Sequence, residues 1–346
     1  MIITNLINCL AKENTSIKSC ILNLEKSTKQ IVFVIDKNKK LLGSITDGDL
    51  RRAMLNNFNI NDKIKDIYNK KPIKTIKLKS EYEAQSIMRF NKINHLPVVD
   101  KKNKICGFYL LNNINSEKNK TNCDFIIMAG GKGKRLRPYT NDCPKPMLRL
   151  SGKPILEKIL ENAKKQGFTN FVISINYLGS IIQKYFKNGK DFGLKISYIK
   201  EKKPLGTLGS LGNYKKEMRK KYVVVSNGDV ITEINYQSMI KFHEQNKSDA
   251  TMAVYPYKSE NPYGVVKTKD TSIVNIDEKP MSISYINAGV YIFNKSMIGY
   301  IKKNQVMDAV TFFNLLRRKN KKTLAFAVHE SWVDIGLKKD YLNYTK

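Results

Sequence analysis

The chain has 346 residues, 41% of them hydrophobic and 27% charged, which is ordinary for a globular protein and long enough for two domains. No apolar run approaches the roughly 18 residues of a membrane-spanning helix, and the N-terminus lacks a basic leader and a cleavage site, so we expect a cytoplasmic protein without a membrane partner. The formal net charge is +32, but only nine of the 62 basic residues are arginine and no nucleic-acid-binding motif occurs, so we expect no specific nucleic-acid partner.

The first third of the chain contains an internal repeat. Phe33–Gly43 matches Pro97–Gly107 at a constant offset, and each copy has two apolar β-branched runs separated by a Lys/Asn turn. This pattern predicts a strand, a turn and a second strand in each copy. A helical pattern of apolar residues precedes each copy, formed by Ile17, Cys20, Ile21 and Leu24 in the first and by Ala84, Ile87 and Met88 in the second.

The repeated β-α-β pattern resembles a tandem pair of CBS (cystathionine-β-synthase-type) domains. We place this module at residues 1–118, with repeats at about 1–58 and 59–118. The resemblance implies a dimerisation element, and therefore a homo-oligomer that dimerises through the CBS module.

One stretch of the first repeat has the form of a ribose-binding motif of the CBS family, Gly-x-x-Thr-x-x-Asp. Thr46 and Asp49 occupy its polar positions, whereas the second repeat has Leu110 and Asn113 there. The resemblance implies that Thr46 and Asp49 bind an adenine nucleotide, since a hydroxyl and a carboxylate both accept hydrogen bonds. The alternative, that Asp49 caps a helix beginning near Leu50, stays open.

A polar segment without apolar periodicity separates this repeat from the rest of the chain, and we predict a linker at 119–123. A second domain is expected over 124–346. It begins with Asp124–Met128, a short apolar strand typical of a buried parallel sheet, which leads directly into a glycine-rich loop.

The loop at residues 129–135 predicts phosphate binding, because its glycines let backbone N–H groups approach an anion closely. It is not a P-loop, since no Ser or Thr follows a Gly-Lys pair. It is not a dinucleotide fingerprint either, since Leu136 stands where that motif requires its last glycine.

The twenty residues Met128–Met147 closely resemble the signature of sugar-1-phosphate nucleotidyltransferases, Ala-Gly-Gly-x-Gly-x-Arg-Leu-x-Pro-x-Thr followed by Pro-Lys-Pro-Met. Further stretches similar to that family follow in order, so the resemblance covers 124–346. It implies an α/β fold with a Rossmann-like, mixed and mostly parallel sheet, preceded here by the tandem CBS module.

The resemblance assigns roles to individual residues. Arg135, Lys145 and Asp229 are the expected catalytic residues, and Asp229 and Asp334 are the expected ligands of a Mg²⁺ cofactor. Taken alone, these two aspartates fit helix N-caps equally well. The expected nucleotide-binding residues are Ala129, Gly130, Gly131, Gly133, Lys134, Arg135, Asn176, Gly206, Thr207 and Gly228. The sugar phosphate is expected at Gly264, Glu278, Lys279 and Asn287. For Asn176 and Tyr177, loop packing is the favoured alternative.

The implied reaction is attack by a sugar 1-phosphate on the α-phosphorus of a nucleoside triphosphate, with release of pyrophosphate and formation of an NDP-sugar for surface glycan synthesis. The stretches around Asn176 and Gly206 look most like guanylyltransferases, so GTP is favoured, with a glucosamine-, mannose- or heptose-type 1-phosphate. The fused CBS pair is similar to guanylyltransferases of the legionaminic-acid pathway. Thymidylyl or uridylyl transfer to a hexose 1-phosphate is the alternative, and a CBS-based nucleotide-sensing regulatory protein is an alternative of another class.

Overall fold

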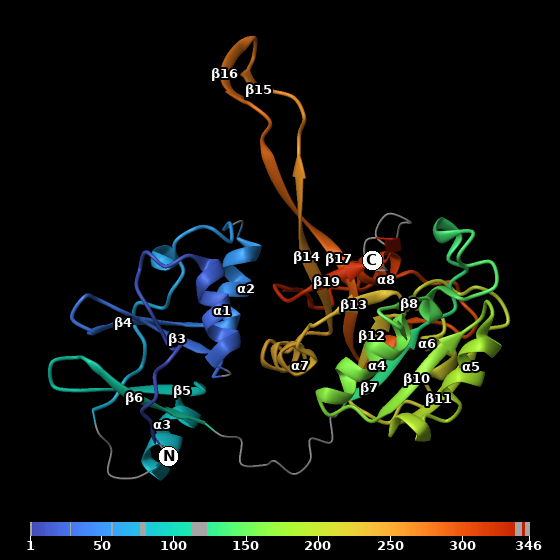
Figure 1. Ribbon diagram of the computed structural model, residues 1–346, viewed down its shortest axis with the longest axis horizontal. Coiled ribbons are helices and arrows are strands. Elements are labelled where there is room, and N and C mark those ends of the chain that lie inside the picture. Colours follow the sequence, from blue (N-terminus) through green and yellow to red (C-terminus); the bar gives the residue numbers. More distant parts are fainter. Residues whose placement is uncertain are drawn as a thin grey trace. The chain divides into compact units, whose positions relative to one another are not determined.

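The computed structural model describes residues 2–27, 29–56, 58–76, 81–111, 123–335 and 341–342, which belong to two compact units, Met1–Ser116 and Glu117–Lys346 (Figure 1). The predicted linker at 119–123 lies outside these residues except for Cys123, which is the first residue of strand β7 (Cys123–Met128) rather than part of a linker. Among the described helices, none has the length and apolarity needed to cross a membrane.

The first unit contains the two predicted repeats, each with a small sheet and helices. The sheet of the first repeat has the order β2-β3-β4 and that of the second has the order β1-β6-β5. The apolar positions predicted for the two helices include Ile17, Cys20, Ala84 and Met88, and all four are buried. The elements are β1 (Ile2–Ile3), β2 (Leu10–Ala11), α1 (Ile17–Ser27), β3 (Ile31–Ile35), β4 (Leu41–Thr46), α2 (Asp47–Leu55), η1 (Ile64–Asp66), α3 (Glu81–Phe90), β5 (His95–Val99) and β6 (Ile105–Leu110).

The two repeats are joined through the first strand of the chain. The sequence places residues 1–58 in one repeat, but β1 pairs antiparallel with β6 of the second repeat. A Cβ atom at Gly107 would lie 2.7 Å from the carbonyl oxygen of Ile3, so only glycine allows this close approach. The β3–β4 and β5–β6 hairpins also share a core, in which the rings of Phe33 and Phe108 lie 5.3 Å apart.

Thr46 and Asp49 form a capping box at the start of α2. The Thr46 side chain accepts from the Asp49 backbone N–H, and the Asp49 carboxylate accepts from the Thr46 backbone N–H at 2.8 Å. The helix therefore begins at Asp47 instead of near Leu50, and its N-cap is Thr46, with Asp49 as the reciprocal partner. The capping alternative accounts for both side chains, and adenine-nucleotide binding there stays a prediction.

Substituting Thr46→Val should lower the free energy of unfolding of the first unit by about 1 kcal/mol, because the helix loses its N-cap oxygen. Thr46→Ser keeps the hydroxyl and serves as the matched control. Calorimetric unfolding of the full chain measures both. Equal free energies of unfolding for Thr46→Val and Thr46→Ser would contradict a capping role.

The second unit is built on a seven-stranded sheet in the order β11-β10-β7-β12-β17-β14-β18. The pairs β11–β10, β10–β7, β7–β12 and β14–β18 are parallel, whereas β17 is antiparallel to both of its neighbours. This confirms the predicted mixed, mostly parallel α/β sheet. The strands are β7, β10 (Asn170–Ile175), β11 (Lys195–Lys200), β12 (Tyr222–Asn227), β14 (Ala250–Glu260), β17 (Met281–Asn294) and β18 (Thr323–Ala327).

Helices cover both faces of this sheet, and the alternation of side chains along each strand supplies two cores. Phe125 and Ile127 of β7 pack in the core that contains residues of α4, α5 and α7, while Ile126 packs in the core that contains residues of α6 and α8. The helices are α4 (Ile155–Lys165), α5 (Gly179–Phe186), α6 (Leu211–Tyr214), α7 (Tyr236–Gln245) and α8 (Ala309–Arg318). The short elements are η2 (Lys134–Leu136), η3 (Lys145–Met147), η4 (Lys190–Phe192), η5 (Lys295–Tyr300), β8 (Arg149–Leu150), β9 (Lys153–Pro154), β13 (Val230–Thr232), β15 (Val265–Lys269), β16 (Ser272–Asp277) and β19 (Trp332–Asp334).

Strand order reverses around β7, because β10 lies on one side of it and β12 on the other. Chain segments that leave the carboxyl ends of β7 and β12 therefore meet at the same edge of the sheet. In open α/β sheets such a switch point is where ligands bind.

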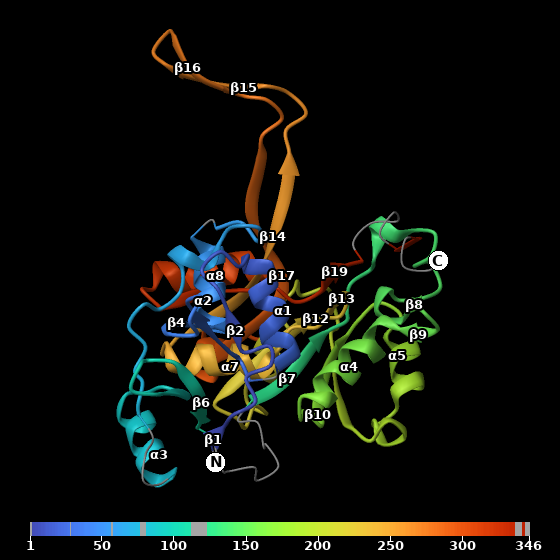
Figure 2. The ribbon, with the colours of Figure 1, turned by 60° about the vertical axis from the view of Figure 1, so that its left-hand side comes forward.

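A long hairpin, the arm (residues 255–286), extends β14 and β17 beyond the sheet. Residues 250–254 of β14 pair with β18, but residues 255–260 pair only with 281–286 of β17. The arm continues into the two-stranded β15–β16 ribbon, and both views show it standing away from the sheet of its unit (Figures 1 and 2).

Candidate active site

A cavity opens at the switch point of the second unit. Of the residues predicted to bind the nucleotide, all except Asn176 line it, as do Lys145 and Asp229. The structure thus brings together segments after β7, β11 and β12. The lining residues are Met128, Ala129, Gly130, Gly131, Gly133, Lys134, Arg135, Leu136, Lys145, Pro146, Glu201, Pro204, Leu205, Gly206, Thr207, Asn227, Gly228, Asp229 and Asp308.

The glycine-rich loop owes its shape to one left-handed residue. Gly133 has φ +60°, and a Cβ there would lie 2.9 Å from the Thr140 side chain. The Thr140 hydroxyl donates to the Gly133 carbonyl at 2.9 Å and fixes the turn. Gly131 faces open space, with no atom within 4 Å of a Cβ placed on it. The loop therefore leaves room for a ligand against its backbone.

Lys145 lies beside the two aspartates that were predicted to bind the metal. Its ammonium donates to Asp229 Oδ2 at 2.6 Å and lies 3.7 Å from Asp334 Oδ1. Asp229 immediately precedes β13, and Asp334 of β19 pairs with Val230 of β13, so this short ladder places the two carboxylates side by side. The N-cap alternative for these two aspartates does not apply, since they lie beside and within a strand pair.

The residues around Lys145 suit a hard cation. Asp229 and Asp334 provide carboxylates, and the nearby Asn227 Oδ1 is buried without a hydrogen-bond partner in the described part of the chain. Nowhere in the described part of the chain do three or more His, Cys, Asp or Glu side chains form a group that could hold a metal ion without further ligands. Mg²⁺ usually binds one or two protein carboxylates and completes its coordination with phosphate and water oxygens. This set of oxygen atoms therefore fits Mg²⁺.

Glu201 is a cavity residue that the sequence did not reveal. Its carboxylate accepts from the Ser174 hydroxyl at 2.7 Å and from the Leu205 backbone N–H at 3.1 Å. Burial raises the pKa of the Glu201 carboxyl above its ordinary value, against the opposing effect of these two hydrogen bonds. A carboxylate has further lone pairs, so Glu201 can accept hydrogen bonds from a ligand as well. Its position directly after β11, at the carboxyl end of a parallel strand, is the one signal that could have identified it.

Asn176 contacts the backbone of Glu201 and does not line the cavity. Its amide donates to the Glu201 backbone carbonyl at 2.7 Å. Tyr177 donates to the Asn141 carbonyl at 2.8 Å. These contacts agree with loop packing, the favoured alternative for this pair.

Asp308, the N-cap residue of α8, is a second lining residue that the sequence analysis missed. Its carboxylate accepts from the Thr207 backbone N–H at 3.2 Å. Gly206 has φ +75°, and a Cβ there would lie 2.6 Å from Asp308 Oδ1, so a side chain at this position is excluded. Asp308 thereby fixes the loop that carries the predicted residues Gly206 and Thr207.

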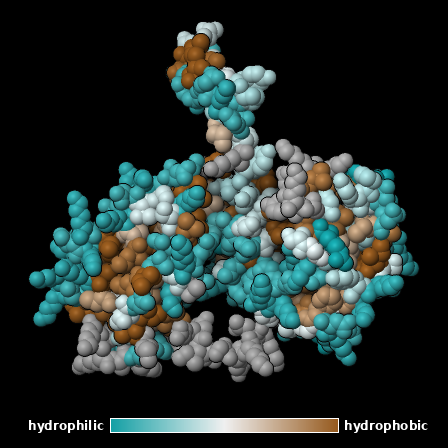
Figure 3. Space-filling view, viewed as in Figure 1, coloured by the Kyte–Doolittle hydropathy of each residue, from teal (hydrophilic) through white to brown (hydrophobic). Residues whose placement is uncertain are grey.

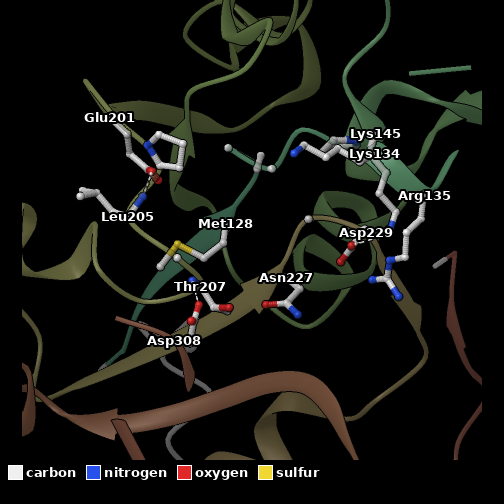
Figure 4. Close-up of a pocket in the computed structure, with 18 of the residues that line it drawn as sticks. Met128, Lys134, Arg135, Lys145, Glu201, Leu205, Thr207, Asn227, Asp229 and Asp308 are labelled. Carbon is white, nitrogen blue, oxygen red and sulfur yellow. Dashed lines mark hydrogen bonds and ion pairs between the residues drawn. The ribbon is translucent and has the colours of Figure 1, made fainter. Parts of the chain in front are cut away.

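The cavity has two chemically different sides (Figure 4). Glu201, Met128 and Thr207 lie on one side and Arg135, Lys145 and Asp229 on the other, with Asn227 between them. One side thus offers hydrogen-bond acceptors and donors beside apolar groups, and the other concentrates positive charge around a carboxylate.

The predicted sugar-phosphate residues lie elsewhere. Gly264, Glu278 and Lys279 are exposed on the arm, where a Cβ at Gly264 would lie 2.9 Å from Glu278 Oε2. Asn287 is at the base of the arm, where it donates to the Tyr291 hydroxyl at 2.9 Å and accepts from the Gly289 N–H at 3.0 Å. Among the described residues, none of these four lines the cavity of the same chain.

Both units of the chain match known protein families in sequence. The nucleotidyl transferase family matches residues 125–346, and CBS domains match 9–56 and 64–116. A D-glycero-α-D-manno-heptose 1-phosphate guanylyltransferase of Aneurinibacillus thermoaerophilus is 34% identical over 62% of this chain and 94% of its own length. A mannose-1-phosphate guanylyltransferase of Mycobacterium tuberculosis is 30% identical over 63% of this chain, which spans 62% of that longer protein.

A solved structure has the same fold as the second unit. The crystal structure of HddC from Yersinia pseudotuberculosis superposes with a TM-score of 0.52 at 28% identity, covering 64% of this chain and 98% of HddC. HddC has also been crystallised in complex with GMP-PN. The chain belongs to the nucleotidyl transferase family and carries a pair of CBS domains ahead of its transferase unit.

Proposed function

We propose that the chain transfers GMP from GTP to a sugar 1-phosphate and releases pyrophosphate. The observation that carries the choice of base is the Glu201 carboxylate inside the cavity. Guanine presents two neighbouring donors, the N1–H and the 2-amino group, which one carboxylate accepts together. Uracil and thymine present a single N–H between two carbonyl oxygens, which a carboxylate repels.

The named relatives support the proposal. Two of them are guanylyltransferases of heptose 1-phosphate and mannose 1-phosphate, and HddC was crystallised with GMP-PN. A UTP–glucose-1-phosphate uridylyltransferase of Synechocystis, 33% identical over 62% of this chain and 61% of its own length, supports uridylyl transfer as the alternative. We propose a glucosamine-, mannose- or heptose-type 1-phosphate as acceptor and surface glycan synthesis as the use of the product.

The proposed chemistry is an in-line displacement at the α-phosphorus. A phosphate oxygen of the sugar 1-phosphate forms the new P–O bond, and the bond to pyrophosphate breaks. Because that oxygen is already ionised, no general base is required. Arg135 and Lys145 hold fixed positive charge where two anions meet. Asp229 and Asp334 would hold Mg²⁺, which supplies further charge neutralisation at the phosphates.

A pyrophosphate-release assay of the full chain tests the proposal, with each of four nucleoside triphosphates against a panel of sugar 1-phosphates and Mg²⁺. The expected result is turnover that requires a sugar 1-phosphate and is fastest with GTP. Fastest turnover with UTP or TTP would overturn the choice of base. Nucleotide binding without turnover on any acceptor would favour the regulatory protein instead.

The preference for GTP should depend on pH. Base reading requires the ionised Glu201 carboxylate, and burial holds its pKa above the ordinary value. Above this raised pKa the preference is constant. As the pH falls through it, protonation removes an acceptor and the preference for GTP over UTP declines. The ratio of kcat/KM for GTP to kcat/KM for UTP measures this preference. The effect of pH on the sugar phosphate is the same with both nucleotides and therefore cancels in the ratio. A ratio that stays constant down to pH 4.5 would contradict the assignment.

The cytoplasmic location and dimerisation through the CBS module stay predictions.

A further inference from the structure

The ladder that places Asp229 beside Asp334 is a separate two-stranded sheet. Among the described strands, β13 and β19 pair only with each other, over three residue pairs. A two-stranded ribbon of this length is marginal in water unless other elements hold it. The separation of the two carboxylates therefore depends on the contacts that fix β13 and β19 to the rest of their unit.

β19 is fixed by Trp332. The indole N–H of Trp332 donates to the Ala288 carbonyl at 2.9 Å, and its ring stacks on the ring of Tyr255, with 4.9 Å between the ring centroids. Ala288 belongs to β17 and Tyr255 to β14, so β19 takes its position from strands of the seven-stranded sheet. Trp332 pairs with Thr232 of β13 across the ladder.

β13 is fixed from another direction, by the helix α4. The Asn162 amide donates to the Thr232 carbonyl at 2.7 Å. The C-cap residue Gln166 donates to the Ile234 carbonyl at 2.9 Å and accepts from the Tyr236 N–H at 2.7 Å. The Gln166 amide also donates to Asn162 Oδ1 at 3.0 Å, which joins the two side chains one helical turn apart. Three backbone groups, at the end of β13 and in its connection to α7, thus depend on these two residues.

Packing alone does not require polar side chains at these two positions. Hydrophilic residues cover much of the surface in Figure 3, where an Asn or Gln is freely solvated. Asn162 and Gln166 are instead half-buried, and their helix contributes Ile159 and Ala163 to the core. A polar side chain that loses water on folding must recover its hydrogen bonds inside the protein. Both residues recover them from the segment that follows Asp229.

The same helix lies next to the segment that contains Lys145. The N–H of Ile155, the first residue of α4, donates at 3.0 Å to the carbonyl of Leu148, which directly follows η3. Met147, Leu148 and Ile155 pack in one core. The helix α4 therefore supports both the ammonium of Lys145 and the strand that begins after Asp229.

We propose that Asn162 and Gln166 are positioning residues of the metal site, which set the separation of Asp229 and Asp334 through the backbone of β13 and thereby set the affinity for a divalent cation. Neither residue lines the cavity. Outer hydrogen-bonding partners that orient metal ligands contribute about 10- to 100-fold to metal affinity. The inference rests on the role of the two aspartates in the proposed transfer reaction.

Mn²⁺ binding by the full chain tests the proposal without turnover. Mn²⁺ takes the same oxygen ligands as Mg²⁺, and electron paramagnetic resonance distinguishes its free and bound forms. Asn162→Leu and Gln166→Leu should each raise the Mn²⁺ dissociation constant about 10-fold. Asn162→Asp should also raise it, because it loses the donor to the Thr232 carbonyl. An added negative charge alone would attract Mn²⁺, so weaker binding by this variant reports the position of the ligands. Asp229→Asn should abolish binding, which identifies the site.

Asn294→Leu is the matched control, because the Asn294 amide donates to the Ser248 carbonyl at 3.1 Å, a similar bond of the same unit away from the ladder. It should lower the free energy of unfolding and keep the wild-type Mn²⁺ dissociation constant. The proposal is overturned by wild-type Mn²⁺ affinity in the Asn162 and Gln166 variants, by an equal loss of affinity in Asn294→Leu, or by a wild-type chain that binds no Mn²⁺. A wild-type chain that binds Mn²⁺ but has no turnover on any acceptor would refute the transfer reaction, which is a different result.

Discussion

Replacing Lys145 by alanine is expected to lower kcat by about 10³-fold, the usual effect of removing one preorganised charge from a phosphoryl-transfer or oxyanion site. Lys145 is almost fully buried, and its ammonium lies within 4.0 Å of both carboxylates of the β13–β19 ladder. Pyrophosphate release at saturating substrates measures the loss, and Asp229→Asn should abolish turnover in the same assay.

The fold should survive both substitutions, since the side chains of Asp229 and Asp334 are 30% and 42% exposed and can be solvated without Lys145. Lys132→Ala is the matched control, because Lys132 is an exposed residue of the glycine-rich loop that does not line the cavity. Near-wild-type turnover of both Lys145→Ala and Asp229→Asn, with circular dichroism unchanged, would contradict the charge-based mechanism.

Glu201→Gln is expected to reverse the nucleotide preference. An amide can still accept from the Leu205 N–H with its oxygen and donate to the Ser174 hydroxyl, which rotates to accept, so the local structure is kept. Towards guanine, however, the variant loses acceptor capacity and leaves a buried donor unpaired. That loss costs about 1–3 kcal/mol, or about a 5- to 150-fold decrease in kcat/KM for GTP. Towards uracil, an amide offers both a donor and an acceptor, so kcat/KM for UTP should rise.

Glu157→Gln provides the control for this change. Glu157 is another buried carboxylate, which accepts from the Tyr185 hydroxyl at 2.7 Å and does not line the cavity. The Glu157→Gln variant should keep the GTP preference of the wild type. If Glu201→Gln also kept that preference, Glu201 would not read the base.

The residues expected to bind phosphate could be predicted from the sequence because they are local in the chain. The loop that ends at Arg135 and the segment around Lys145 are contiguous motifs whose glycines and prolines impose their own backbone shapes. Asp229 could be predicted from a buried strand followed by a carboxylate, whereas Asp334 was expected from the family resemblance alone. The structure brings the two together through a three-residue ladder.

Other features depend on tertiary structure and could not be predicted. Glu201 is one acidic residue in a lysine-rich stretch, and only the pairing of β10 with β11 places it beside the cavity. Likewise, β1 has no pattern that assigns it to the second repeat, because two residues are too few to show alternation. The start of α2 was misplaced because the Thr46–Asp49 box resembles both a cap and a ligand motif. The sequence order of Gly264, Glu278 and Asn287 indicated an acceptor site but not that three of the four predicted residues stand on an arm.

A competition experiment with the wild-type chain tests the central claim most directly. GTP, UTP, TTP and CTP at equal concentrations are incubated with glucosamine, mannose and heptose 1-phosphates and Mg²⁺, and the nucleotide sugars are identified by mass spectrometry. The account predicts a GDP-sugar as the dominant product, in amounts equal to the pyrophosphate released. A dominant UDP- or dTDP-sugar, or no nucleotide sugar at all, would contradict it.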